Sequence, residues 1–256
     1  MIRVLLIALG YLLLSQLIPV LICAPFVYLS NTLSGAPADV SGQGLLLPGL
    51  AIGDVLVVCV LWWKGFFKNN RASFALVSWR FMLWTAGVML SAILLSDYLM
   101  RFLTFLPDWN AEDIVQVLDN PLGIALIAVI GPVIEELVFR GVITKQLLAR
   151  YRPWPAILAS AAIFGLIHIN PAQIPVAFAL GILFGWLYYR SRSVVPGILM
   201  HILNNSLSVW LQLNFPQDET LQETVGTAYY LLLALAVVVF VVAMWRCPAV
   251  RANQNS

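Results

Sequence analysis

The chain alternates between long apolar runs and short polar segments. Most runs approach or exceed the roughly 20 residues that a helix needs to cross a hydrocarbon core of about 30 Å. Only helices and closed barrels satisfy their own backbone hydrogen bonds in lipid. The pattern therefore predicts an all-α, polytopic membrane helix bundle of about eight transmembrane helices. The predicted spans are 3–29, 44–63, 79–99, 121–148, 154–174, 174–190, 194–213 and 227–246.

The composition supports a membrane protein and excludes a water-soluble globule, since 61% of residues are hydrophobic and 10% are charged. No repeat and no loop long enough for a soluble domain interrupts the spans. We expect a single integral membrane domain over 1–256, with a core at about 121–213 that carries the polar motifs. The first run is too long for the apolar part of a cleaved secretory signal, so we expect a retained helix.

The charged residues alternate in sign from one side of the predicted membrane to the other. Cytoplasmic loops are enriched in Lys and Arg, so both termini are expected to be cytoplasmic, in a multi-pass protein of the plasma (inner) membrane. The net charge of +2 gives no nucleic-acid-binding face. The basic segments contain Arg3, Lys64, Lys68, Arg71, Arg80, Lys145, Arg150, Arg152, Arg190, Arg192, Arg246 and Arg251. The alternate segments contain Asp39, Asp97, Asp108, Glu112, Asp113, Asp119, Asp218, Glu219 and Glu223, with Arg101.

Several ionisable residues lie inside the apolar spans, where a charge costs about 2.5 to 3.5 kcal/mol on insertion scales. Such residues should face the bundle interior or a hydrated cavity, and they need partners or a function. They are Asp54, Glu135, Glu136, Arg140, His168 and His201.

The segment IEELVFRG at 134–141 places two carboxylates in a predicted membrane helix. Glu136 and Arg140 are four residues apart, so they share a helix face and are expected to form an ion pair. Glu135 is turned about 100° away and has no partner within the helix. A desolvated carboxylate beside a second one suits a general base, which makes Glu135 the candidate.

The segments FGLIH at 164–168 and HILNN at 201–205 carry the two histidines. On helices, Phe164 and His168 share a face, as do His201 and Asn205, while Asn204 points elsewhere. Counted at 1.5 Å per residue from the helix ends, these residues and Glu135 fall at similar depths. The sequence therefore predicts one buried polar site made by three separate helices.

The three motifs EExxxR, FxxxH and HxxxN, in this order, resemble those of the CAAX protease and bacteriocin-processing family of intramembrane proteases. They are formed by Glu135, Glu136 and Arg140, by Phe164 and His168, and by His201 and Asn205, within 131–205.

The resemblance implies hydrolysis of a peptide bond in a membrane-associated peptide or protein. Glu135, assisted by His168, would activate water, and His201 with Asn205 would form an oxyanion hole. Glu136 and Arg140 would support these residues, and Phe164 would contact the substrate.

The sequence does not decide whether the predicted site binds a metal ion. Glu135, His168 and His201 could supply three zinc ligands and leave a fourth position for water. The HExxH pattern of zinc proteases is absent, however, and a metal-free mechanism using glutamate and histidine is equally compatible with the family. The sequence allows zinc but does not require it.

Two other function classes use similar residues. Transporters also place carboxylates at the membrane midplane, although no internal repeat pairs the two halves of this chain. A non-catalytic scaffold or immunity protein of the same fold would retain every motif. Asp54 belongs to no motif, and the sequence defines neither the substrate, including whether it is prenylated, nor the oligomeric state.

Overall fold

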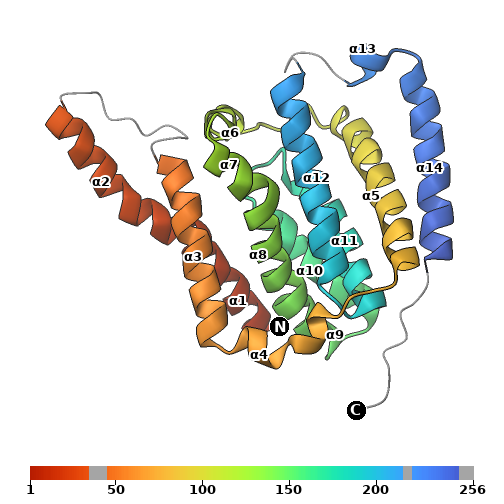
Figure 1. The fold of residues 1–256 in the computed structure, drawn as a ribbon, viewed down its shortest axis with the longest axis horizontal. Helices are drawn as coiled ribbons and strands as arrows, with labels where there is room; N and C mark the ends of the chain where they lie inside the picture. Colours follow the sequence, from red (N-terminus) through yellow and green to blue (C-terminus); the bar gives the residue numbers. More distant parts are fainter. Residues whose placement is uncertain (35–44, 216–220, 248–256) are drawn as a thin grey trace.

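The computed structural model describes residues 1–34, 45–215 and 221–247, and in these residues it contains helices and no strands. The helices run side by side in a bundle (Figure 1). The predicted all-α fold is confirmed. Position 44 of the second predicted span lies outside the described residues, as do Asp39, Asp218, Glu219 and Arg251.

The helices follow the predicted spans closely. The α-helices are α1 Ile2–Leu12, α2 Ile18–Ser34, α3 Leu47–Trp63, α4 Phe66–Asn69, α5 Trp79–Met100, α6 Ala111–Leu118, α7 Pro121–Ala125, α8 Gly131–Val138, α9 Lys145–Leu148, α10 Pro153–Leu166, α11 Ile174–Ser191, α12 Val195–Asn214, α13 Leu221–Val225 and α14 Ala228–Arg246. The order also includes the π-helical segments η1 Leu13–Leu17, η4 Leu126–Ile130 and η5 Phe139–Thr144, and the 3₁₀ helix η3 Arg71–Phe74.

Length and composition identify five described segments able to cross a membrane: Ile2–Ser30, Trp79–Met100, Pro121–Leu148, Ile174–Ser191 and Ala228–Arg246. The shorter helices Leu47–Trp63 and Pro153–Leu166 are also apolar. The helix α12 is not among these five segments, because its polar residues, among them His201 and Asn205, lower its mean hydropathy. The protein is a multi-pass membrane protein. The number of membrane crossings, about eight, stays a prediction.

The fifth predicted span, 154–174, is too long. The helix α10 ends at Leu166, and a turn connects it to α11, which begins at Ile174. Pro171 disfavours helical backbone at the preceding Asn170, because its ring collides with that residue. As a result, His168 lies in the turn and not on the helix.

Two of the π-helical segments lie just before prolines. A proline lacks the backbone N–H and its ring collides with the carbonyl four residues earlier, so the hydrogen-bond ladder must adjust there. Pro132 follows η4, and Pro19 follows η1. The wider turn of η4 directs a backbone carbonyl toward α12, as described below.

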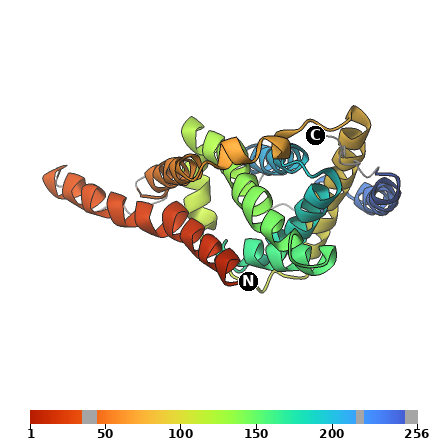
Figure 2. The ribbon, with the colours of Figure 1, turned by 90° about the horizontal axis from the view of Figure 1, so that it is seen from below.

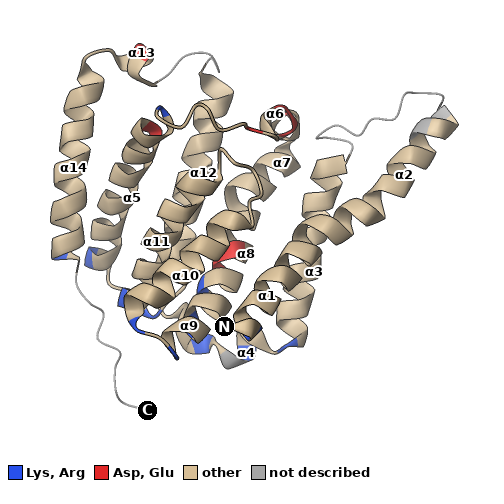
Figure 3. Cartoon of the chain, turned by 180° about the vertical axis from the view of Figure 1, so that it is seen from behind, with Lys and Arg blue, Asp and Glu red and all other residues tan. Residues whose placement is uncertain are grey.

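The two ends of the bundle differ in charge. Figure 3 shows most Lys and Arg residues at the end that holds α4 and α9, and most Asp and Glu residues at the opposite end, with an acidic segment in α8. The short helix α6, at the acidic end, is amphipathic, with Glu112 and Asp113 in its first turn and Val117 and Leu118 buried. This separation follows the sequence pattern on which the predicted orientation rests.

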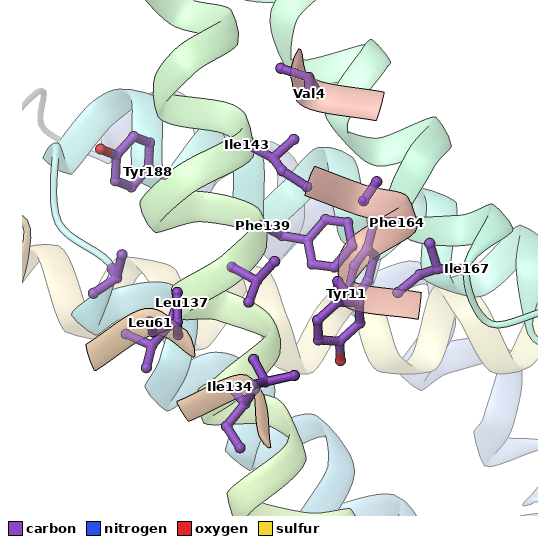
Figure 4. Close-up of a cluster of buried hydrophobic side chains, with 14 of the residues drawn as sticks. Val4, Tyr11, Leu61, Ile134, Leu137, Phe139, Ile143, Phe164, Ile167 and Tyr188 are labelled. Carbon is purple, nitrogen blue, oxygen red and sulfur yellow. The ribbon is translucent and has the colours of Figure 1, made fainter. Parts of the chain in front are cut away.

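The motif-bearing helices pack at the centre, while the α1–α2 segment extends away from the bundle (Figure 2). A buried cluster joins α1, α3, α8, η5 and α10 (Figure 4). In it, the ring of Phe139 contacts those of Phe164 and Tyr11 edge-on, at centroid distances of 5.0 and 5.6 Å. This apolar cluster holds α8 and α10 in fixed positions beside the polar site.

Candidate active site

Glu136 and Arg140 form a buried ion pair. Their side chains are 0% and 1% exposed, and Arg140 Nη1 lies 2.8 Å from Glu136 Oε1. The i,i+4 pairing expected from the sequence is therefore present. Glu135, on the neighbouring face of α8, keeps 21% of its side chain exposed. One carboxylate is fixed inside the bundle, and the other is partly exposed.

Aromatic rings and a carbonyl complete the surroundings of Arg140. Its Nη2 donates a hydrogen bond to the Gly181 carbonyl at 3.3 Å. The guanidinium carbon lies 4.5 Å from the ring centroid of Phe164 and 5.1 Å from that of Phe184. The negative faces of aromatic rings attract a cation, so these contacts offset part of the cost of burying Arg140.

His201 lies between the two glutamates. Its Nδ1 is 3.2 Å from Glu136 Oε1, and its Nε2 is 3.9 Å from Glu135 Oε2. A carboxylate only accepts hydrogen bonds, so Nδ1 carries the proton shared with Glu136. The ring is also stacked on Phe184 at a centroid distance of 4.8 Å. These contacts fix the tautomer and the orientation of His201, and they direct Nε2 toward Glu135.

His168 is held in the turn after α10. Its Nδ1 donates a hydrogen bond to the Phe164 carbonyl at 2.8 Å, which leaves Nε2 available. The following residue, Ile169, has a φ of 62°, a backbone conformation that a β-branched residue rarely adopts. The carbonyl of Ile167 accepts a hydrogen bond from Gln16 Nε2 at 3.1 Å. The turn is thus anchored from α10 and from η1.

Both histidines contact the ring of Phe164. Ring centroids lie 5.0 Å apart for Phe164 and His168, and 6.0 Å apart for Phe164 and His201. The histidine within 4.0 Å of a Glu135 oxygen is His201, and no such contact with His168 occurs in the described part of the chain. Any assistance from His168 would therefore pass through a water molecule or a substrate.

Asn205 lies one turn after His201 on α12. Its Nδ2 donates a hydrogen bond to the Ile127 carbonyl at 2.9 Å, and Ile127 belongs to η4. Asn204, which was expected to point elsewhere, donates to Asn205 Oδ1 at 3.0 Å, so that expectation was wrong. With its oxygen and one hydrogen of its amide engaged, Asn205 is oriented with its second N–H still available.

Glu135, His168 and His201 do not gather into a metal site. Among the described residues, no three His, Cys, Asp or Glu side chains are grouped closely enough to hold a metal ion. The described contacts of Glu135 within 4.0 Å include His201 but not His168, and His201 directs one nitrogen to Glu136. The arrangement does not fit the three-ligand zinc site that the sequence left open.

Asp54 is a half-buried residue of α3. It lies within electrostatic range of Glu135, and both carboxylates are within range of Tyr11 on α1. In α3, Leu50 and Ala51 pack against the buried cluster that contains Leu126 of η4, and Val57 joins the cluster containing Ile134. Helical spacing therefore places Asp54 on the side of α3 that faces α8.

Gly197 was not singled out from the sequence, although it precedes His201 by four residues and so shares its face of α12. A Cβ atom at this position would lie 2.5 Å from Glu136 Oε2. The spacing to His201 was the available signal. Gly197 allows α12 to approach the buried carboxylate closely.

We expect Gly197→Ala to lower stability by about 1 to 3 kcal/mol, the usual cost of overpacking, because Glu136 must leave its contact with Arg140 or with His201. The midpoint of thermal unfolding in detergent measures this change. Gly87→Ala in α5 is the matched control, since its added Cβ would meet Val239 at an ordinary 3.6 Å. Equal midpoints for both variants would contradict the close approach at Gly197.

Comparison with known proteins supports the motif-based resemblance. Residues 118–207 match the family described as Type II CAAX prenyl endopeptidase Rce1-like. The chain is 32% identical over 105 residues to a protein provisionally named membrane peptidase YdiL of Bacillus subtilis, covering 41% of this chain and 43% of that protein. It is 35% identical over 115 residues to the membrane-embedded CAAX protease MroQ of Staphylococcus aureus, covering 42% and 47%.

The resemblance to CAAX proteases is confirmed for this region, which contains all three motifs. The aligned part spans less than half the length of each of these relatives. No solved structure gives a significant match to the chain.

Proposed function

We propose that the protein is an intramembrane endopeptidase that hydrolyses a peptide bond in a membrane-associated peptide or protein. The observation that carries this proposal is the bridge made by His201 between buried Glu136 and accessible Glu135, at 3.2 and 3.9 Å. It places a candidate oxyanion donor beside a candidate base whose side chain is partly exposed. The match of residues 118–207 to a prenyl endopeptidase family supports the same reaction.

Glu135 is the proposed general base. It removes a proton from water, and the hydroxide attacks the scissile carbonyl carbon to give a tetrahedral intermediate. The protonated Glu135 then returns this proton to the leaving nitrogen as the C–N bond breaks, leaving a new carboxyl and a new amine. His168, with Nδ1 on the Phe164 carbonyl, uses Nε2 to accept a hydrogen bond from the same water.

His201 and Asn205 are the proposed donors to the negatively charged oxygen of the intermediate. The second N–H of Asn205 is available for this role, and His201 donates through Nε2 when both its nitrogens carry protons. Glu136 and Arg140 act through His201 by holding its Nδ1. Phe164 is 1% exposed and contacts both histidine rings and the Arg140 guanidinium, so its proposed role is to support these side chains and not to contact the substrate.

We expect Asn205→Ala to reduce the rate of cleavage about 10²- to 10³-fold, the usual effect of removing one oxyanion donor. Single-turnover cleavage of a fluorogenic membrane peptide measures this rate. Asn214→Ala is the control, because Asn214 lies near the end of the same helix and donates to the Trp210 carbonyl. A loss of ten-fold or less in Asn205→Ala, with binding intact, would remove Asn205 from the oxyanion hole.

The proposal extends to substrate and location. The family match makes a membrane-attached C-terminal peptide carrying a prenyl group the first substrate to test. The basic end of the bundle, with its Lys and Arg, is the proposed cytoplasmic end. Both chain termini are proposed to lie on that side of the plasma membrane.

Comparative proteomics tests the proposed function without a guess at the substrate. Membranes from cells that make the wild type are compared with membranes from cells that make Glu135→Gln, and new peptide termini are identified by mass spectrometry. Termini that depend on Glu135 would support a protease. If the wild type and Glu135→Gln restore a cellular phenotype equally and give identical peptide termini, the protein is a non-catalytic scaffold. If it carries solute across the membrane without cleaving peptides, it is a transporter.

A further inference from the structure

A large apolar groove lies outside the candidate active site. It has a volume of about 690 Å³ and runs between α1, α3 and the η5–α9 segment. We call it the basic-end groove, since it is lined by Ile7, Gly10, Val57, Leu61, Val142 and Lys145, among others. Tyr11, which also lines the groove, packs edge-on against Phe139 at 5.6 Å. No residue of the candidate active site lines the groove, although Tyr11 lies within electrostatic range of Glu135.

The groove has the length of one membrane leaflet. Along the η5–α9 wall it extends from Val138 to Ala149, which corresponds to roughly 16 Å at 1.5 Å per residue. Half of a hydrocarbon core of about 30 Å is about 15 Å. The neighbouring Leu6 and Leu9 on α1 are 61% and 51% exposed, so the surrounding surface is suited to lipid.

The mouth of the groove is cationic. Lys64 and Lys145 line it, and both are exposed at the end where basic residues gather (Figure 3). Lys145 Nζ donates to Asn70 Oδ1 at 2.6 Å, which holds it beside the opening. Among the described lining residues there is no Asp or Glu. Charge complementarity therefore favours an anionic group at the mouth.

The wall of the groove favours a hydrocarbon chain over a peptide. A peptide segment buried there would need partners for its backbone N–H and C=O groups, and unpaired groups in an apolar site are costly. Below the mouth the lining is aliphatic and aromatic, apart from the Tyr11 hydroxyl. A hydrocarbon chain needs no such partners.

We propose that the basic-end groove binds an anionic phospholipid of the adjacent leaflet, with one acyl chain in the groove and the headgroup phosphate between Lys64 and Lys145. Basic pockets between membrane helices bind anionic headgroups in this way. Gly10 leaves room for the chain, because a Cβ atom added there would meet no atom within 4 Å. The bound lipid thus forms part of the wall of the bundle.

Native mass spectrometry of the full-length protein, released from nanodiscs of equal parts phosphatidylglycerol and phosphatidylcholine, tests this proposal. The wild type should retain phosphatidylglycerol over phosphatidylcholine by at least about five-fold. Lys64→Gln with Lys145→Gln should bring this ratio close to one, whereas Lys68→Gln, from the same basic end but outside the groove, should keep it. Gly10→Leu should reduce retention of both lipids by occupying the groove.

Equal retention of the two lipids by the wild type would overturn the proposal, as would a preference that survives the double lysine change. Displacement of the lipid by a prenylated peptide would also overturn it, because the groove would then belong to the substrate. Circular dichroism and a single elution peak establish that each variant is folded. If Gly10→Leu does not fold, the double lysine variant and its Lys68 control decide the outcome.

Discussion

Replacing Glu135 by glutamine is expected to reduce peptide cleavage about 10²- to 10⁴-fold, the range supplied by a general base. The amide keeps the size of the side chain but cannot accept the proton of water. Because Glu135 is partly exposed and lies 3.9 Å from His201, the change should leave folding intact. Initial rates with a fluorogenic membrane peptide measure the effect.

Glu112→Gln is the control for this variant, since Glu112 is an exposed residue of α6 at the end of the bundle. It should cleave at the wild-type rate. Unchanged helix content and unchanged substrate binding in Glu135→Gln would assign the loss to chemistry. Retention of more than one tenth of wild-type activity would exclude Glu135 as the base.

Replacing Arg140 by methionine is expected to destabilise the protein by about 3 to 5 kcal/mol, because it leaves the charge of Glu136 buried and uncompensated. Glu136 is 0% exposed, and Arg140 Nη1 is its ion-pair partner at 2.8 Å. Equilibrium unfolding in mixed micelles measures the free energy of unfolding. Activity should fall as well, since Glu136 would no longer hold His201.

Two further variants sharpen this prediction. Arg71→Met removes an exposed arginine at the basic end and should change the free energy of unfolding by less than about 0.5 kcal/mol. Adding Glu136→Leu to Arg140→Met removes the orphaned charge and should restore much of the stability, but not the activity. An Arg140→Met protein as stable as Arg71→Met would show that the pair is not buried as described.

Helical periodicity and hydropathy predicted most of the fold, because each helix in lipid must satisfy its own backbone and be apolar over a fixed length. The i,i+4 spacing likewise predicted the Glu136 and Arg140 pair. The end of α10 at Leu166 was missed although Pro171 signalled it, since the apolar character of the chain continues through Ile167 and Ile169. Hydropathy does not distinguish a buried turn from a helix.

The finer arrangement of the site depends on contacts between helices that local spacing does not specify. His201 bridges Glu135 and Glu136 because Gly197 lets α12 approach α8 closely. The π-helical η4 directs the Ile127 carbonyl to Asn205, and Asn204 turns toward Asn205 instead of away. These contacts depend on irregular backbone segments and on how the helices cross. Short sequence motifs do not specify either of these.

Cleavage in water enriched in ¹⁸O tests the central claim most directly. The purified protein, reconstituted in nanodiscs, is incubated with a prenylated membrane peptide, and the new carboxyl terminus is weighed by mass spectrometry. We expect one ¹⁸O atom in that carboxyl group from the wild type and no product from Glu135→Gln. Equal labelled product from both proteins would contradict the assignment of Glu135 as the residue that activates water.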